Sequence, residues 1–180
     1  NGIDEANFAA NQLLKSNIEV HSIYTSILTR ANHTANIVAD ILKFDKNEIQ
    51  YDWRLNERHY GALEGLNKSE TATKYGEDQV LMWRRSYDIP PPLLDKNDKR
   101  HPKFHPKFKN IDCDLPVGES LKDVIDRLNP FWNEYFNQIK NTTGNHLIVA
   151  HSNSLRAIIK VLENLSKRDI ISINIPTGVP

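Results

Sequence analysis

Apolar residues recur with a helical period in several stretches of this chain. The first such face consists of Ile3, Ala6, Ala10, Leu13 and Leu14. The clearest repeat lies between Leu28 and Leu42, where apolar residues follow one another at intervals of three or four. Because the first pattern begins with the first residues, we expect the chain to start inside an element.

Short apolar runs between the helical stretches predict strands. Val20 to Thr25 and Ile49 to Trp53 have the length and composition of strands. Leu147 to Ala150 is a continuous apolar run, which is typical of a strand buried on both faces of a parallel sheet. Strands that alternate with helices predict an α/β fold with a mainly parallel central sheet.

Capping residues mark further helices. Asn67 with Glu70 indicates a capping box that opens a short helix, and Ser120 with Asp123 opens a long one. A last helix is expected after the apolar run, with these residues facing inward: Leu155, Ile158, Ile159, Leu162 and Leu165.

Residues 88–118 differ from the rest of the chain. Six of the nine prolines lie there, among Lys, Asp and His. Such a composition prevents a regular buried element, so we expect a long surface excursion that acts as a mobile lid or a subunit contact. His101 and His105 are separated by Pro102, which excludes an ordinary helix, so we expect no metal site.

For the chain as a whole, we expect no internal repeats and a single domain over residues 1–180.

Composition narrows the choice of partners and compartment. Lys+Arg and Asp+Glu number 23 each, so the net charge is zero, which argues against a general nucleic-acid binder. The single cysteine, Cys113, excludes an intrachain disulfide and favours a reducing cytoplasm. No apolar run approaches the length of a membrane span, so we expect no membrane partner.

The apolar run near residue 150 leads directly into His151, Ser152 and Asn153. Open α/β sheets bind ligands at the carboxyl ends of their strands, and the start of the following helix favours an anion. His151 is therefore placed to meet a phosphate. A histidine that only ends a strand and bonds a nearby carbonyl would give the same pattern, so both interpretations stay open at this point.

Two further stretches are rich in charge. In residues 54–61, Glu57 lies next to Arg58 and close to another arginine, a histidine and a tyrosine, which makes it a candidate general acid. The alternative is a solvated loop with salt bridges. Arg84 and Arg85 are adjacent and would grip one anion at a helix end, because guanidinium binds phosphate and carboxylate in bidentate fashion. The alternative is a solvated pair.

Taken together, five motifs resemble one family, the cofactor-dependent phosphoglycerate mutases of the histidine phosphatase superfamily. The resemblance covers essentially the whole chain in the expected order, and it rests on the stretches Thr25–Ala31, Trp53–Lys68, Trp83–Pro92, Ala150–Arg156 and Asn174–Pro180. It implies a three-layer α/β/α fold with a mainly parallel sheet.

The resemblance also implies a glycolytic and gluconeogenic reaction. Members interconvert 3-phosphoglycerate and 2-phosphoglycerate through a phosphohistidine, primed by 2,3-bisphosphoglycerate and without a metal, commonly as cytoplasmic homodimers. Glu57 would be the general acid/base, and His151 would stabilise the transferring phosphoryl group. The implied substrate-binding residues are Arg30, Arg58, His59, Tyr60, Lys68, Arg84, Arg85, Ser152 and Asn153.

Two departures from the family pattern matter. Family members open with a strand that ends in Arg-His-Gly, whose histidine is phosphorylated, and this sequence contains no Arg-His-Gly. We therefore expect a chain truncated at both ends, without its first and last strands and inactive alone. Ser152 stands where the family usually has glycine, and its side chain would either crowd the phosphate pocket or add a donor.

Two other functions stay open. A broad phosphatase of the same superfamily would release phosphate from many esters without isomerising them. A non-catalytic member would only bind phosphorylated ligands or a partner chain, and the absent histidine motivates this alternative.

Overall fold

The computed structural model describes residues 1–180, apart from the side chain of Lys68. The chain forms two compact units, each assembled from separate stretches of sequence. Unit 1 comprises Asn1–Glu57, Arg127–Arg156 and Asn174–Pro180, and unit 2 comprises Arg58–Asp126 and Ala157–Ile173. The single domain expected from the sequence stays a prediction. Within the described residues, no helix is both long and apolar enough to cross a membrane.

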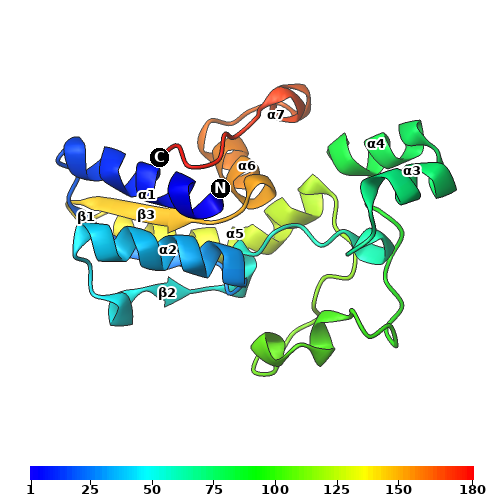
Figure 1. The fold of residues 1–180 in the computed structure, drawn as a ribbon, viewed down its shortest axis with the longest axis horizontal. Helices are drawn as coiled ribbons and strands as arrows, with labels where there is room; N and C mark the ends of the chain where they lie inside the picture. The colour runs from blue at the N-terminus through cyan, green and yellow to red at the C-terminus, as the bar shows by residue number, and fades with distance from the viewer. The chain divides into compact units, whose positions relative to one another are not determined.

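A parallel sheet forms the centre of unit 1 (Figure 1). Its strands, in spatial order, are β2 (Gln50–Tyr51), β1 (Val20–Thr25) and β3 (Asn145–Val149). Tyr24 pairs with Gln50 on one side and with Ile148 on the other. Because all three strands run in one direction, their carboxyl ends meet at the same edge. The sheet confirms the predicted parallel α/β fold.

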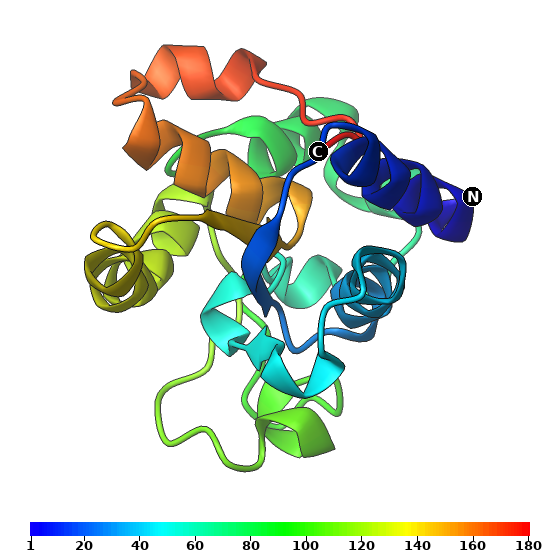
Figure 2. The same cartoon turned by 90° about the vertical axis from the view of Figure 1, so that its left-hand side faces the viewer.

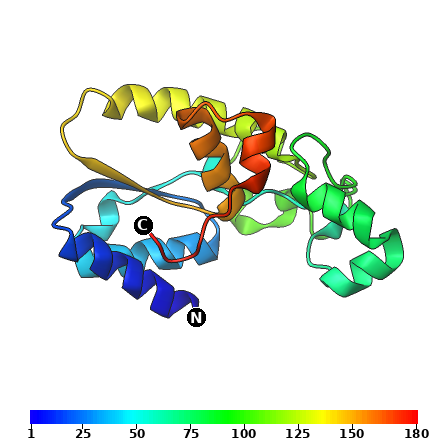
Figure 3. The same ribbon diagram turned by 90° about the horizontal axis from the view of Figure 1, so that it is seen from above.

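Helices cover both faces of this sheet (Figures 2 and 3). On one side lie α1 (Gly2–Lys15) and α2 (Thr29–Leu42), and on the other the C-terminal part of α5 (Leu121–Ile139). Ile23 clusters with Ala35 of α2, whereas the ring of its neighbour Tyr24 lies 6.1 Å from that of Phe131 on α5. Successive side chains of a strand point to opposite faces, which gives the predicted three layers.

Two strand predictions are wrong in part. The predicted strand at residues 49–53 is only two residues long, because the carboxylate of Asp52 caps a 3₁₀ helix, η2 (Trp53–Leu55). Another 3₁₀ helix, η1 (Lys46–Glu48), precedes it. The strand β3 is not buried on both faces: it lies at an edge of the sheet and borders a cavity, so its residues are exposed or half-buried.

The helix after β3 also differs from its prediction. It is α6 (Ser152–Leu162), and it buries Ile158, which is 8% exposed, as expected. However, Leu162 is 57% exposed and Leu165 lies beyond the helix end. The predicted series of inward-facing residues from Leu155 to Leu165 is therefore correct only in its first part.

Unit 2 consists mainly of short helices and irregular chain. Its complete helices are η3 (Gly61–Leu63), α3 (Lys68–Tyr75), α4 (Glu77–Arg85), η4 (Pro102–Phe104), η5 (Pro106–Phe108) and α7 (Lys167–Ser172). Asn67 caps α3 by accepting the backbone N–H of Ser69. Ser120 and Asp123 form the predicted reciprocal cap of α5, in which each side chain accepts the other's backbone N–H.

Within 88–118, two successive His-Pro-Lys-Phe tetrapeptides adopt the same turn. In each, the histidine Nδ1 accepts the backbone N–H of the lysine, and the histidine ring packs edge-on against the phenylalanine. The expectation of no internal repeat is therefore wrong at a length of four residues. The start of the stretch is anchored, because the Pro92 carbonyl accepts the N–H of Ala62 at 2.8 Å. Its role as a lid or subunit contact stays a prediction.

Candidate active site

His151 lies between the end of β3 and the start of α6, where the sequence predicts it. Its side chain is buried, with 4% exposed. Nδ1 lies 3.2 Å from Nη2 of Arg30 near the start of α2, and Nε2 lies 3.0 Å from Oγ of Ser26, directly after β1. The carboxyl ends of two adjacent strands and the beginning of two helices thus meet at this imidazole.

The hydrogen bonds around Ser26 identify the tautomer of His151. Asn56 Oδ1 accepts the backbone N–H of Ile27 at 3.1 Å, and the Ser26 hydroxyl donates to the same oxygen at 2.8 Å. Since this donation uses the only hydroxyl hydrogen, the Ser26 oxygen accepts from Nε2–H of His151. Nδ1 is then the acceptor that faces Arg30. The imidazole is therefore neutral.

The electrostatic surroundings favour this neutral form. Burial lowers the pKa of His151 to about 4, the cations of Arg30 and Arg127 act in the same direction, and the carboxylate of Glu57 opposes them. The imidazole is consequently uncharged at neutral pH. An anion placed beside Nδ1 would favour the protonated imidazole and raise the pKa.

Glu57 is oriented by the first turns of α6. Nδ2 of Asn153 donates to Oε1 of Glu57 at 3.0 Å. Arg156 donates to Oδ1 of the same amide at 3.3 Å, which determines that the NH₂ group faces the carboxylate. Asn153 and Arg156 are 7% and 6% exposed, so water competes little for these bonds. Glu57 therefore contacts the helix that follows His151, within unit 1.

A cavity of about 420 Å³ lies beside β3 in unit 1. Arg30, Glu57, His151 and Ser152 line part of it, and the remaining walls are mainly apolar residues of α1, α2, β3 and the last residues of the chain. Ser152 is the exposed first residue of α6, where free backbone N–H groups favour an anion. A guanidinium, an imidazole and a helix start can hold a phosphate group, with one carboxylate available for proton transfer.

A second group of predicted residues lies in unit 2. The guanidinium carbons of Arg58 and Arg84 lie 4.7 Å and 5.2 Å from the centre of the Tyr60 ring. Arg58 is 2% exposed, and its Nη2 donates to the carbonyls of Trp83 and Arg84 at the end of α4. Arg58 therefore holds the C-terminus of α4, next to the predicted arginine pair. Arg85 is exposed at the end of this helix.

The remaining predicted residues are placed as follows. His59 is half-buried, and its Nδ1 accepts the backbone N–H of Gly61 at 3.0 Å. The side chain of Lys68 lies outside the described part of the structure, so its predicted substrate contact is untested. Among the described side chains, no group of three or more His, Cys, Asp or Glu could hold a metal ion.

Sequence reasoning missed the polar residues that position the site in unit 1. These are Ser26, Asn56, Arg127 and Arg156. Ser26 and Asn56 are 0% and 6% exposed. A buried polar group needs a hydrogen-bond partner, and these two lie close to Arg30 and Glu57 in sequence. Their proximity to the predicted site residues was the available signal, but their burial and partners depend on long-range packing.

Comparisons with known proteins show the family of this chain. The chain matches the family described as "Histidine phosphatase superfamily (branch 1)" over residues 1–94 and 93–178. Proteins named 2,3-bisphosphoglycerate-dependent phosphoglycerate mutase from Porphyromonas gingivalis, Borreliella burgdorferi and Parabacteroides distasonis are each 48% identical over 180 residues. Each match covers 99% of this chain and 73% of the relative.

Solved structures share the fold at lower identity. A mycobacterial glucosyl-3-phosphoglycerate phosphatase superposes with a TM-score of 0.68 at 22% identity, covering 96% of this chain and 72% of its own. Bacillus stearothermophilus YhfR superposes with a TM-score of 0.67 at 20% identity, covering 98% and 72%. The resemblance found in the sequence motifs is confirmed. The chain belongs to branch 1 of the histidine phosphatase superfamily and, within it, to the family of 2,3-bisphosphoglycerate-dependent phosphoglycerate mutases.

Proposed function

We propose that this protein interconverts 3-phosphoglycerate and 2-phosphoglycerate and is primed by 2,3-bisphosphoglycerate. The observation that carries the proposal is the grouping of Arg30, Glu57 and His151 in one cavity. The 48% identity to relatives with this printed name supports it. The homodimer expected from the family resemblance belongs to the same proposal.

The residues of unit 1 divide the chemistry between them. Arg30, His151 and the first N–H groups of α6 hold a phosphoryl group, because phosphoryl transfer depends mainly on positioning and charge stabilisation. Glu57 exchanges a proton with the substrate hydroxyl. Asn153 orients Glu57 through the 3.0 Å hydrogen bond. A phosphate beside Nδ1 of His151 favours uptake of a proton from solvent by the imidazole, and the resulting imidazolium stabilises the transferring group.

The primer carries two phosphates and a carboxylate, so it needs several cations. Each phosphate monoester contributes roughly −1.5 to −2 at neutral pH. In unit 1, Arg30 would offset part of this charge. In unit 2, the family resemblance implies the same role for Arg58, Arg84 and Arg85. The ligand supplies the phosphoryl group when it is bound.

The nucleophile is the finer part of the proposal. Among the described side chains, His151 is the one histidine that lines the cavity. Both of its ring nitrogens are engaged, one with Arg30 and one with Ser26. This supports an assisting role for His151. We propose that the phosphorylated histidine belongs to a segment outside these 180 residues.

Assays on the intact protein test this function. Isomerisation of phosphoglycerate should depend on 2,3-bisphosphoglycerate, and mass spectrometry should find the phosphate on a histidine other than His151. Rapid phosphate release from many esters without isomerisation would favour the phosphatase alternative. Ligand binding with neither activity would favour a non-catalytic member.

The variant Glu57→Gln tests the acid–base role. Turnover should fall by about two to four orders of magnitude, the usual contribution of a general acid or base. The KM should change little, because the neutral amide occupies the same volume. Glu19→Gln is the matched control, since Glu19 is exposed before β1 and away from the cavity. Normal turnover of Glu57→Gln would remove Glu57 from the mechanism.

A further inference from the structure

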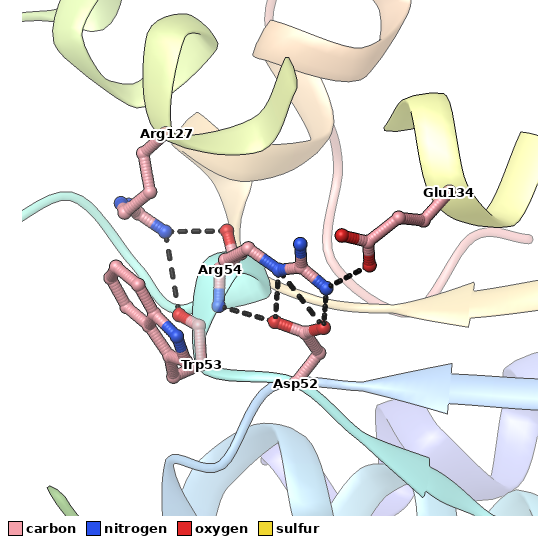
Figure 4. Close-up of polar contacts among 5 residues, drawn as sticks. All are labelled: Asp52, Trp53, Arg54, Arg127 and Glu134. Atoms are coloured by element: carbon pink, nitrogen blue, oxygen red, sulfur yellow. Dashed lines mark hydrogen bonds and ion pairs between the residues drawn. The ribbon is translucent and has the colours of Figure 1, made fainter. Parts of the chain in front are cut away.

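Arg127 of α5 contacts the backbone that leads into Glu57 (Figure 4). Its Nη1 donates to the carbonyl oxygens of Arg54 at 2.5 Å and Trp53 at 3.5 Å. Its Nη2 donates to the carbonyl oxygen of Asn56 at 3.1 Å. One guanidinium therefore holds three carbonyls of η2 and its C-terminal cap, and the next residue along the chain is Glu57.

Asn56 connects this backbone to His151. Its carbonyl also accepts the hydroxyl of Ser154 in α6 at 2.5 Å, and its side chain accepts the hydroxyl of Ser26, which contacts the imidazole. Asn56, Ser26 and Ser154 are 6%, 0% and 0% exposed. Water cannot readily replace a hydrogen bond that is lost among buried groups. A displacement of Asn56 would therefore change the positions of both Glu57 and His151.

We propose that Arg127 is a positioning residue, whose guanidinium fixes Glu57 relative to His151 by holding the carbonyls of Trp53, Arg54 and Asn56. The catalytic consequence rests on the proposed function. Guanidinium is a planar fork with donors on three nitrogens, so one side chain can reach carbonyls on either side of a turn. A lysine has a single nitrogen on a flexible stem and cannot bridge the same set in one geometry.

Arg54 provides a matched control within the same cluster (Figure 4). Its guanidinium forms ion pairs with Asp52 at 2.7 Å and Glu134 at 2.8 Å. Its side chain is therefore directed to carboxylates, whereas that of Arg127 is directed to the carbonyls before Glu57. Arg54→Lys makes the same chemical change a few ångströms away, without removing the three-carbonyl contact.

The first measurement compares the two lysine variants in the intact protein. Arg127→Lys should lower kcat by about 10- to 100-fold with KM within about threefold, because a small misplacement of a reacting group costs this much. Arg54→Lys should keep kcat within about twofold. If Arg127→Lys keeps its kcat, or loses only thermal stability as Arg54→Lys does, the positioning role is wrong.

A second measurement does not depend on mutase activity. The backbone N–H of Ile27 donates to Oδ1 of Asn56, so its hydrogen exchange reports whether Asn56 is held. Exchange of Ile27 should accelerate in Arg127→Lys and stay unchanged in Arg54→Lys. An unchanged Ile27 in Arg127→Lys would overturn the proposal. If the unmodified protein lacks mutase activity, the proposed function fails, while this exchange measurement still decides the role of Arg127.

Titration of His151 distinguishes an electrostatic effect of Arg127→Lys on kcat from a positioning effect. The charged groups that face His151 are Arg30 from α2, Arg127 from α5 and Glu57 from the segment after η2. Because lysine keeps the positive charge, the pKa of His151 should change little in Arg127→Lys. A lower kcat with an unchanged pKa of His151 then supports the positioning role. A kcat that recovers when the assay pH is adjusted by a shift in the pKa of His151 contradicts it.

Discussion

A single buried imidazole illustrates how packing sets chemistry in this protein. His151 is held as the neutral tautomer by Ser26 and Arg30, and burial keeps its pKa at about 4. A histidine in water has a pKa near 6.5. Between these values the unfolded chain binds a proton that the folded chain does not. The contribution of His151 to stability is therefore complete above about pH 6.5 and is lost as the pH falls toward 4.

Titration of His151 by NMR tests this environment. The pKa should lie near 4 in buffer without multivalent anions and should rise when inorganic phosphate is added, because a phosphate at Nδ1 stabilises the imidazolium. Urea unfolding between pH 7 and 4 should show a matching loss of stability, reduced in His151→Asn. A pKa near 6.5 that phosphate does not change would contradict both the burial and the anion site.

The backbone of Gly61 in unit 2 leaves no room for a side chain. Its φ is +58°, and a Cβ added there would lie 2.2 Å from the carbonyl oxygen of Pro92. Gly65 has a similar φ of +73° but no atom within 4 Å of an added Cβ. The pair therefore separates the cost of the left-handed backbone from the cost of a steric clash.

Alanine substitutions at the two glycines should differ in unfolding free energy. Gly65→Ala should cost about 1–2 kcal/mol, the usual cost of the left-handed region. Gly61→Ala should cost about 1–3 kcal/mol more, as overpacking typically does. Chemical denaturation of both variants measures the difference. Equal losses would show that residues 90–92 can move away from Gly61 without cost.

At the scale of elements, the sequence predicts the helices and strands that are specified by their own pattern of apolar residues. The periodic helices α1, α2 and α5 and the strand β1 are confirmed, because one buried face suffices to specify each. The burial of β3 could not be predicted, since an apolar run does not reveal whether both neighbouring positions in the sheet are filled. Likewise, Leu162 continues the helical period of α6 and yet is 57% exposed.

For the candidate site, the sequence motifs point to the proposed reacting groups but not to the residues that hold them. Glu57 and His151 come from motifs whose residue types indicate phosphate chemistry, and Arg30 comes from the family resemblance. Ser26 and Arg127 do not, since serine and arginine occur throughout protein surfaces. Their roles arise from contacts between residues far apart in sequence. Ser26 contacts His151, which is 125 residues away, and Arg127 contacts the carbonyl of Arg54, which is 73 residues away. Only the packed chain brings these groups together.

For the whole molecule, we expect stability to be distributed unevenly and residues 95–111 to open most readily. Their backbone hydrogen bonds are local turns, such as His101 to Asp98 and Phe104 to His101. Within this segment, the Phe104 side chain is 56% exposed, so it buries little apolar surface. Segments with few buried contacts and no strand ladder open most readily.

Limited trypsin digestion tests this distribution. Exposed cleavage sites are available in the segment at Lys96, Lys99, Arg100, Lys103, Lys107 and Lys109. The first cut should fall within residues 96–109, and hydrogen exchange should be fastest there. If 88–118 also acts as a lid, 3-phosphoglycerate should slow this cleavage, whereas an equal concentration of sulfate should have a weaker effect. Cleavage that begins in α1 or α7, or slow exchange in 96–109, would show that this stretch is packed as firmly as the core.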